Sequence, residues 1–365
     1  MSVMDRLKKN SKIKGSDILA NSKIFSQQDF APTQVPMVNV ALSGDTEGGL
    51  GSGLTVLAGP SKHFKTSFAL LMAAAYMKKH PESIMLFYDS EFGSPQTYFE
   101  SFDIDTSRIL HTPITDVEKL KFDLVSQLEA IEKDDRVIIV IDSIGNLASK
   151  KELEDAINEK SVADMSRAKA LIGLFRMVTP YLTMKNIPLL AINHTYKEIG
   201  LYPKDIVSGG TGAYYSADAI WIIGRQQDKD GTEIRGYNFV INIEKSRHVR
   251  EKSKIPIMVT FEGGIMKWSG LLEVAEKGGY VVKPKVGWYE ALNPATGEVL
   301  CDKMMRAKEM VDNKDFWLMM FQKTDLANYI ESRYKMASSG LMSDDDSQIP
   351  EHVEEAPVVN AEETV

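Results

Sequence analysis

Residues 59–66 read Gly-Pro-Ser-Lys-His-Phe-Lys-Thr and lie between an apolar run, residues 54–58, and an apolar helical pattern, residues 68–77. A loop that joins a strand to a helix N-terminus points several backbone N–H groups at one place, which suits a chain of phosphates. In this motif the lysine reaches the β- and γ-phosphates and the following hydroxyl binds Mg²⁺. We therefore expect ATP and Mg²⁺ to bind at this phosphate loop and the helix start, namely Gly59, Pro60, Ser61, Lys62, His63, Phe64, Lys65, Thr66 and Ser67.

Phe64 departs from the usual motif, which has glycine at this position. A phenylalanine resists a positive φ and crowds any close approach to the backbone. The simpler alternative is an ordinary strand-to-helix turn with a solvated lysine. The correct spacing of Gly59, Lys65 and Thr66 between a strand pattern and a helix pattern favours the nucleotide site.

The rest of the chain alternates apolar strand patterns with helical patterns such as residues 116–132 and 161–184. Strands that are covered on both faces read as continuous apolar runs. Alternating strands and helices predict an α/β fold with a mostly parallel central sheet. The strand runs are residues 54–58, 84–88, 137–141, 189–192 and 219–223. The predicted division is an N-terminal arm that docks on a neighbouring protomer (1–30), an ATPase core (31–268), a small domain (269–342) and a disordered acidic tail (343–365).

Charge is concentrated at the two ends of the chain. The tail holds eight acidic residues and no Lys or Arg, and without it the chain has 43 acidic and 43 basic residues. A neutral average gives no long-range attraction for nucleic acid, so a DNA surface must be a local patch or form on assembly. The first 23 residues are basic, as in arms that dock on a partner.

The sequence also carries signals about its compartment. Cys301 is the single cysteine, which excludes an intramolecular disulfide, and the N-terminus lacks the apolar core of a secretion signal. The longest apolar stretch is well short of the ~20 residues that a membrane span needs. We expect a cytoplasmic protein with no membrane partner.

Polar side chains follow three of the predicted strands, at the edge where a parallel sheet collects its chemistry. Asp142 is placed to hold the Mg²⁺ shell through water, and a capping role is the alternative. Asp89 and Glu91 both follow the second strand, and either carboxylate could orient the water that attacks a γ-phosphate. Spacing leaves that choice open. His194 lies near the position of a γ-phosphate sensor, with a structural role as the alternative.

Several motifs are informative in combination. They are residues 35–43, the phosphate loop, 87–93 (Phe-Tyr-Asp-Ser-Glu-Phe-Gly), 141–143, 146–152, 191–195, 209–218 and 244–247. Together they resemble the RecA-type recombinases, and closely their phage branch, the UvsX-type recombinases, from about residue 35 to about residue 341. The resemblance implies a RecA-like core and a small α+β C-terminal domain. It also makes Phe64 a family trait whose side chain turns away from the nucleotide.

The resemblance implies roles for individual residues. Glu91, not Asp89, is implied as the catalytic glutamate, and Tyr98 as the ring that stacks on adenine. His194 stands where most of the family has the glutamine that senses the γ-phosphate, so sensing would depend on histidine protonation. Lys245 and Arg247 are implied to reach the ATP of the next protomer.

The same resemblance implies two DNA-binding loops, residues 146–166 and 195–213. Cations neutralise DNA phosphates, and aromatic rings stack on bases. The second loop directly follows His194, which offers a route from the state of the nucleotide to the grip on DNA. The residues expected to bind DNA are Lys150, Lys151, Lys160, Lys197, Tyr202, Lys204 and the flexible glycines Gly209 and Gly210.

The implied function is ATP-dependent homologous recombination. A helical filament of this chain would form on single-stranded DNA, pair it with homologous duplex DNA and exchange strands, assisted by a mediator and a single-strand-binding protein. One alternative is a ring-shaped helicase on the same core, which would need an N-terminal helical domain for which 30 residues leave no room. A KaiC-like signalling ATPase would duplicate the core, and no repeat is visible.

Overall fold

The computed structural model describes residues 2–13, 15–22, 29–132, 134–159, 165–198, 203 and 205–336. The predicted tail, residues 343–365, and three of the predicted DNA-binding residues, Lys160, Tyr202 and Lys204, lie outside these ranges.

A nine-stranded sheet forms the centre of the molecule, in the order β11-β10-β9-β8-β1-β5-β4-β2-β3. The strands from β8 to β3 in this order pair in parallel, and β9, β10 and β11 extend the β8 edge in antiparallel fashion. The predicted mostly parallel α/β sheet is confirmed. The strands are β1 (Gly53–Ala58), β2 (Ile84–Asp89), β3 (Ile109–Pro113), β4 (Val137–Asp142), β5 (Pro188–Asn193), β8 (Ala219–Asp230), β9 (Glu233–Ser246), β10 (Lys254–Thr260) and β11 (Gly264–Ile265).

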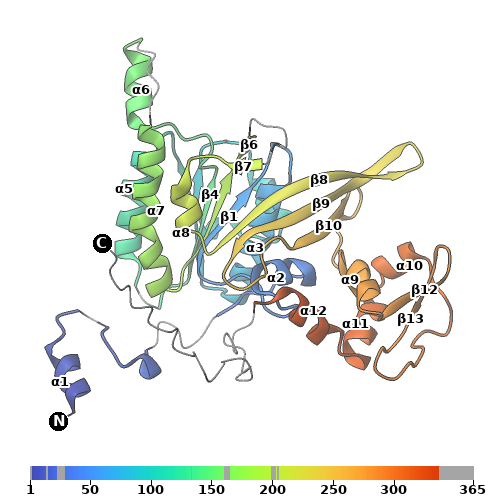
Figure 1. The fold of residues 1–365 in the computed structure, drawn as a ribbon. Helices are drawn as coiled ribbons and strands as arrows, with labels where there is room; N and C mark the ends of the chain where they lie inside the picture. The colour runs from blue at the N-terminus through green and yellow to red at the C-terminus, as the bar shows by residue number, and fades with distance from the viewer. Residues whose placement is uncertain are drawn as a thin grey trace, which may run out of the picture.

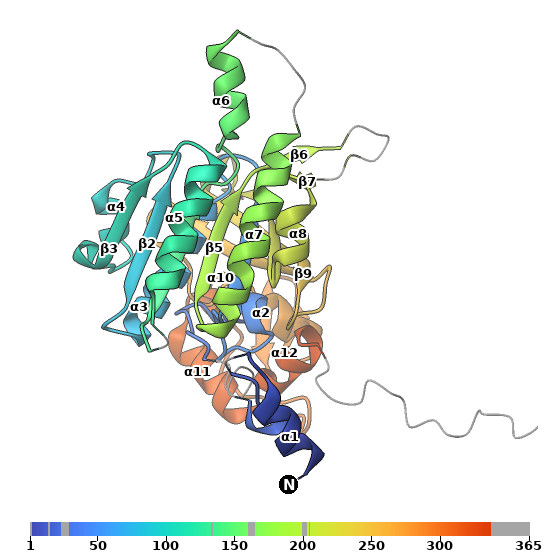
Figure 2. The ribbon, with the colours of Figure 1, turned by 90° about the vertical axis from the view of Figure 1, so that its left-hand side faces the viewer.

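Helices cover both faces of the sheet, because alternate side chains of each buried strand enter two separate apolar cores. Leu57, Met85 and Val140 face one core with helices α2 (Pro36–Ser43) and α3 (Lys65–Lys79). Leu54, Leu86 and Ile139 face the other core with α5 (Val117–Ala130) and α7 (Ser166–Met184), which lie side by side across the sheet (Figure 2). Burial on both faces explains why these strands read as unbroken apolar runs.

Strands β8 and β9 form a long hairpin that reaches sideways beyond the parallel strands (Figure 1). The sequence predicted only residues 219–223 of this hairpin, since the later part of β8 is polar. Helix α1 (Val3–Asn10) lies away from the central sheet (Figure 1), and none of its described residues is buried.

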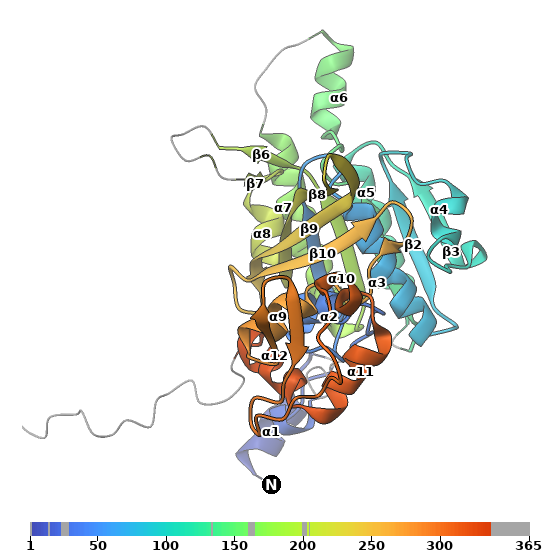
Figure 3. The same cartoon turned by 90° about the vertical axis from the view of Figure 1, so that its right-hand side faces the viewer.

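The C-terminal part of the described chain is a small α+β unit beneath the β8–β10 strands (Figure 3). It contains α9 (Leu271–Lys277), the hairpin β12 (Val281–Lys285) with β13 (Trp288–Ala291), α10 (Ala307–Val311), α11 (Lys314–Lys323) and α12 (Leu326–Tyr334). Helix α11 ends at Lys323 and α12 begins at Leu326. There the Thr324 hydroxyl donates to Met320 O (2.6 Å), and Asp325 accepts a bond from the Tyr280 hydroxyl (2.7 Å).

Candidate nucleotide-binding and catalytic site

The phosphate loop opens into a cavity of about 690 Å³ at the carboxyl edge of the parallel sheet. The loop and the start of α3 form its floor, and the β8–β10 strands form one wall. The predicted residues that line it are Ser61, Lys62, His63, Phe64, Lys65, Thr66, Ser67, Glu91, Tyr98, Asp142 and His194. The structure thus brings together residues from five separate segments of the sequence.

Phe64 takes the backbone conformation that the motif normally gives to glycine. Its φ is 61°, in the left-handed region, which contradicts the expectation that phenylalanine would resist it. The ring stacks on Phe239 of β9, with centroids 4.9 Å apart and planes inclined by 21°, and meets Phe68 edge-on. Phe64 is the N-cap of α3 and makes no side-chain cap, so the first N–H groups of the helix remain open toward the cavity.

Lys65 is buried, with 7% of its surface exposed, and its Nζ donates to Pro60 O at 2.8 Å. Burial lowers the pKa of Lys65, while the carboxylates of Glu91 and Asp142 act in the opposite direction. An ammonium group held this close to the loop backbone matches the predicted role at the β- and γ-phosphates.

Asp142 and Thr66 form the candidate Mg²⁺ site. The Thr66 hydroxyl donates to Asp142 Oδ2 at 2.9 Å, and Asp142 Oδ1 is buried without a partner among the described residues. Burial raises the pKa of Asp142 to about 6. The described residues contain no cluster of three or more His, Cys, Asp and Glu side chains that could hold a metal. This donor set suits Mg²⁺, which keeps several waters and takes most other ligands from phosphates.

Glu91 and Asp89 have different environments, although both follow β2. Glu91 Oε1 accepts a bond from the Ser143 hydroxyl (2.6 Å) and lies 3.1 Å from His194 Nε2. The hydrogen bond with His194, followed by that with Ser143, lowers the pKa of Glu91 against the effect of burial. Asp89 instead accepts from the backbone N–H groups of Glu91 and Phe92, so it shapes the turn. Geometry therefore places Glu91, and not Asp89, in the cavity.

Tyr98 lies at the rim of the cavity on α4 (Gln96–Glu100), and its hydroxyl is hydrogen-bonded to Ser67 Oγ. The ring is thereby fixed beside the start of α3, where the predicted adenine contact would be.

Lys245 and Arg247 do not line the cavity of their own chain. Lys245 pairs with Ile220 at the start of β8, and Ile220 in turn pairs with Val56 in the middle of β1, so strand β8 separates Lys245 from β1, which the phosphate loop follows. Lys245 Nζ donates to Tyr214 O (2.7 Å), and Arg247 Nε lies 2.5 Å from Asp218 Oδ1. Their action on a neighbouring protomer stays a prediction.

The first predicted DNA-binding loop contains a helix, α6 (Lys150–Ile157), which projects beyond the carboxyl edge of the sheet (Figure 2). Ser149 begins the helix in a capping box with Glu152, and Lys150 Nζ lies 3.7 Å from Glu154 Oε1. Lys151 is the second residue of the helix and is exposed.

The second predicted loop contains a short hairpin of β6 (Thr195–Lys197) and β7 (Asp205–Val207), where Lys197 pairs with Asp205 at 2.9 Å. The flexibility of Gly209 and Gly210 and their contact with DNA stay predictions. A Cβ on Gly209 would lie 2.7 Å from Leu171 of α7, so the glycines allow the chain to pack closely before α8 (Thr211–Ser216).

Several residues of the site could not be predicted from the sequence, among them Ser143, Arg225 and Tyr237. Ser143 is fully buried and donates to Glu91, and its only signal was its place directly after Asp142. Arg225 and Tyr237 line the cavity from β8 and β9. Their sequence neighbourhood gives no sign of this, because the contact from Arg225 to the phosphate loop spans 163 residues.

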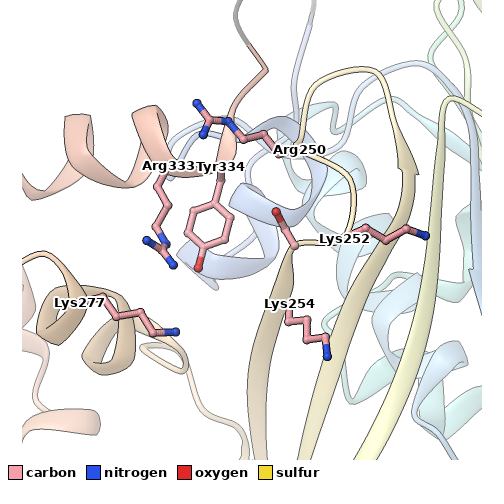
Figure 4. Close-up of a pocket in the computed structure, with 7 residues that line it drawn as sticks. Arg250, Lys252, Lys254, Lys277, Arg333 and Tyr334 are labelled. Carbon is pink, nitrogen blue, oxygen red and sulfur yellow. The ribbon is translucent and has the colours of Figure 1, made fainter.

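A second cavity, of about 420 Å³, lies between the β9–β10 turn, α9 and α12 (Figure 4). Five cationic side chains line it, together with Ser253 and Tyr334. Arg250 donates to Ser332 O (2.8 Å), and Lys252 pairs with Glu244 (2.7 Å). The cations are Arg250, Lys252, Lys254, Lys277 and Arg333.

Comparison with known proteins decides the family. Residues 14–266 match the model of the RecA N-terminal domain. The chain belongs to the RecA family. Residues 268–330 match a further model, described as Bacteriophage T4, Recombination and repair protein, C-terminal domain. The predicted resemblance to RecA-type recombinases and their phage branch is confirmed.

Individual RecA-family relatives agree with this result. The chain is 49% identical over 336 residues to the recombination and repair protein of Enterobacteria phage T4, covering 91% of this chain and 86% of that protein. It is 26% identical over 297 residues to RecA of Chloroherpeton thalassium, covering 78% and 81%. These similarities give the helicase alternative no support. No helix in the described part of the chain has the length and apolar character to cross a membrane.

Proposed function

We propose that this RecA-family chain is an ATP-dependent homologous-recombination recombinase. The observation that carries the proposal is the single cavity in which the phosphate loop meets Asp142, Glu91 and His194. A phosphate cradle, a metal-binding carboxylate and a second carboxylate paired with a histidine are the parts that nucleotide hydrolysis needs.

The phosphate loop and the open N-terminus of α3 would bind the phosphates of ATP, with Lys65 reaching the β- and γ-phosphates. Thr66 and Asp142 would hold Mg²⁺, the latter through water. The bound ion would neutralise charge that develops on the phosphates. Tyr98 would stack on the adenine.

Glu91 would orient the attacking water, because its carboxylate is fixed by Ser143 and His194 and its lowered pKa keeps it ionised at neutral pH. His194 would report the presence of the γ-phosphate. Its contact with Glu91 would join the sensing group to the catalytic group, so a movement of the His194 ring would alter the position of the Glu91 carboxylate.

Lys245 and Arg247 would complete the site of the next protomer, which makes hydrolysis depend on a homo-oligomeric helical filament. Their absence from the lining of the nucleotide cavity of their own chain supports this arrangement. The basic arm, residues 1–30, would dock on the neighbour.

Single-stranded DNA and homologous duplex DNA would be the nucleic-acid partners, bound in a bacterial cytoplasm with the help of a mediator and a single-strand-binding protein. The two predicted loops, residues 146–166 and 195–213, would carry the DNA contacts through Lys150, Lys151, Lys160, Lys197, Tyr202 and Lys204. The division into arm, core (31–268), small domain (269–342) and acidic tail is part of this proposal.

Electron microscopy of the protein with single-stranded DNA and a slowly hydrolysed ATP analogue tests the proposal. We expect helical filaments that cover the DNA and that are absent when ADP replaces the analogue. Closed rings would favour a helicase, and unassembled protein under all conditions would exclude a filament-forming recombinase.

A further inference from the structure

Two residues of the phosphate loop occupy a backbone region that non-glycine residues avoid. Lys62 and Phe64 both have a φ of 61°. A loop with two such residues does not keep its shape from local preference, so contacts with another element must hold it. The strands β8 and β9 supply these contacts.

Phe64 is held by its stack on Phe239 and by the edge-on contact with Phe68. Lys62 is held differently. Arg225 Nη1 donates to Lys62 O at 3.1 Å, and the Arg225 guanidinium lies 4.7 Å from the centroid of the Tyr237 ring. A guanidinium over an aromatic face is attracted to the ring while its edge stays free to donate.

The three wall residues share one face of the β8–β9 hairpin. Arg225 pairs with Phe239 in the antiparallel register, and Tyr237 lies two positions away along β9, on the same side. Gly59, at the start of the loop, packs just as closely on β8, since a Cβ there would lie 2.9 Å from Ile223 O. The loop therefore contacts the hairpin at Gly59, Lys62 and Phe64.

We propose that Arg225, with Tyr237 as its platform, is a positioning residue that fixes the phosphate loop in its nucleotide-binding shape. The inference rests on the proposed function as an ATP-binding recombinase. Arg225 bonds to a loop carbonyl, not to a group that reacts, so it acts on nucleotide affinity through Lys62. Because the loop binds phosphates that ADP and ATP share, both nucleotides depend on Arg225 to the same extent.

Substitution of Arg225 gives a distinctive pattern. Arg225→Ala should weaken the binding of a fluorescent ADP and of a slowly hydrolysed ATP analogue by the same factor, about tenfold, since one hydrogen bond to a strained loop is lost. KM for ATP should rise by a similar factor, and kcat with saturating ATP and single-stranded DNA should fall less than threefold. Arg225→Lys should not restore affinity, because an ammonium group lacks the planar edge and face.

Tyr237 tests the platform. Tyr237→Phe keeps the ring and should bind both nucleotides like the wild type. Tyr237→Ala should weaken both about fivefold, and Arg225→Ala/Tyr237→Ala should be no weaker than Arg225→Ala alone, because the two side chains act as one unit. Arg176→Ala, which removes an exposed arginine from α7, is the matched control.

The outcomes separate this inference from the proposed function. If the wild type binds neither nucleotide, the proposed function fails. Wild-type affinity in folded Arg225→Ala, full rescue by Arg225→Lys, or a loss confined to the ATP analogue would each overturn the positioning role. Circular dichroism and thermal melts establish that the variants are folded. Should Arg225→Ala unfold, Arg225→Lys and Tyr237→Ala carry the test.

Discussion

Asp142 is a buried carboxylate with one satisfied oxygen and one that has no partner among the described residues. Burial disfavours the ionised form, which raises its pKa to about 6. At neutral pH Asp142 is therefore ionised in the nucleotide-free protein, although no described residue forms a hydrogen bond with its Oδ1. A residue of this kind lowers stability for the sake of function.

Asp142→Asn should therefore stabilise the nucleotide-free protein at neutral pH while weakening Mg²⁺-dependent nucleotide binding. The cost of ionising Asp142 is on the order of 3 kcal/mol, given its ordinary pKa of 3.8 and its raised value of about 6. The Asp142 carboxyl binds its proton more tightly in the folded state than in the unfolded state. The protonated carboxyl therefore adds to the free energy of unfolding below about pH 4, and this stabilisation is lost as the pH rises through about 6.

Urea unfolding across that pH range measures the effect. The wild type should lose stability relative to Asp142→Asn between about pH 4 and pH 6, and the difference should then stay constant. Asp312→Asn, an exposed substitution, is the control. A variant that is less stable than the wild type at pH 7, or that binds Mg²⁺-nucleotide normally, would argue against the metal-binding role.

At the scale of elements, both predicted DNA-binding loops have one end beside His194 at the nucleotide site. Asn193 Nδ2 donates to Ser208 O (2.7 Å), which ties the end of the second loop to the residue before His194. Gly145, directly before the first loop, packs on the same histidine, since a Cβ on Gly145 would lie 2.4 Å from His194 Cδ2. Arg167 of α7 fixes the segment 144–147, because its guanidinium donates to the carbonyls of residues 144, 145 and 147. Movement of His194 would thus reach both loops.

Helix α6 gives a prediction about DNA affinity. If Lys150 and Lys151 each neutralise one phosphate, Lys150→Ala/Lys151→Ala should reduce the slope of log K against log salt for single-stranded DNA by about 1.4, since each phosphate contributes roughly 0.7. Fluorescence anisotropy titrations across a salt series measure this slope. Lys78→Ala, at the far end of α3, should leave it unchanged. An unchanged slope in the double variant would remove both lysines from the DNA surface.

The elements that were predictable from sequence are those whose burial is uniform. Strands β1, β2, β4 and β5 are almost entirely buried and read as apolar runs. The outer part of β8 was missed, because its residues after 223 are mostly polar and its pairing with β9 depends on a partner strand. Helix α6 was not predicted either, because none of its residues is buried and no buried face marks it in the sequence.

The site was predictable where chemistry follows a strand directly. Lys65, Thr66 and Asp142 could be placed by adjacency alone. The sequence could not decide between Asp89 and Glu91, because the decision depends on which carboxylate accepts the backbone hydrogen bonds of the turn after β2. In the structure that carboxylate is Asp89. Arg225 could not be found either, since its role is a contact between residues distant in sequence.

At the scale of the whole molecule, the proposed catalytic groups lie at two separate places on one chain. Neither Lys245 nor Arg247 lines the nucleotide cavity, so under the proposal one protomer alone would hold an incomplete site. Hydrolysis should then depend on the contact between protomers.

Mixing two inactive variants tests this arrangement. Lys65→Ala loses the phosphate contact, and Lys245→Ala/Arg247→Ala loses the groups supplied to the neighbour. Each alone should be inactive. A mixture should regain part of the DNA-stimulated hydrolysis, because one kind of interface then has both intact halves. A mixture no more active than its components would indicate action within one chain or a structural role.

The acidic tail gives a second prediction at this scale. Eight carboxylates on residues 343–365 resemble a phosphate backbone and would compete with DNA for basic surfaces. The five-cation cavity is close to where the described chain ends, since Arg333 and Tyr334 line it. Truncation at Met342 should therefore tighten DNA binding at low salt.

The gain from truncation should shrink as salt rises, because the Debye length falls from ~30 Å at 0.01 M to ~8 Å at 0.15 M. Titration of labelled single-stranded DNA with full-length and truncated protein measures it. Superimposable isotherms at every salt concentration would leave solubility or partner recruitment as the role of the tail.

Strand exchange between circular single-stranded DNA and linear duplex DNA tests the central claim most directly. With ATP and Mg²⁺ the wild type should convert homologous substrates into joint molecules and exchanged products, and it should leave heterologous duplex unchanged. Lys65→Ala should form neither product. Filaments and DNA-stimulated hydrolysis without any exchange, or exchange that proceeds without a nucleotide, would contradict the account of this chain as an ATP-dependent recombinase.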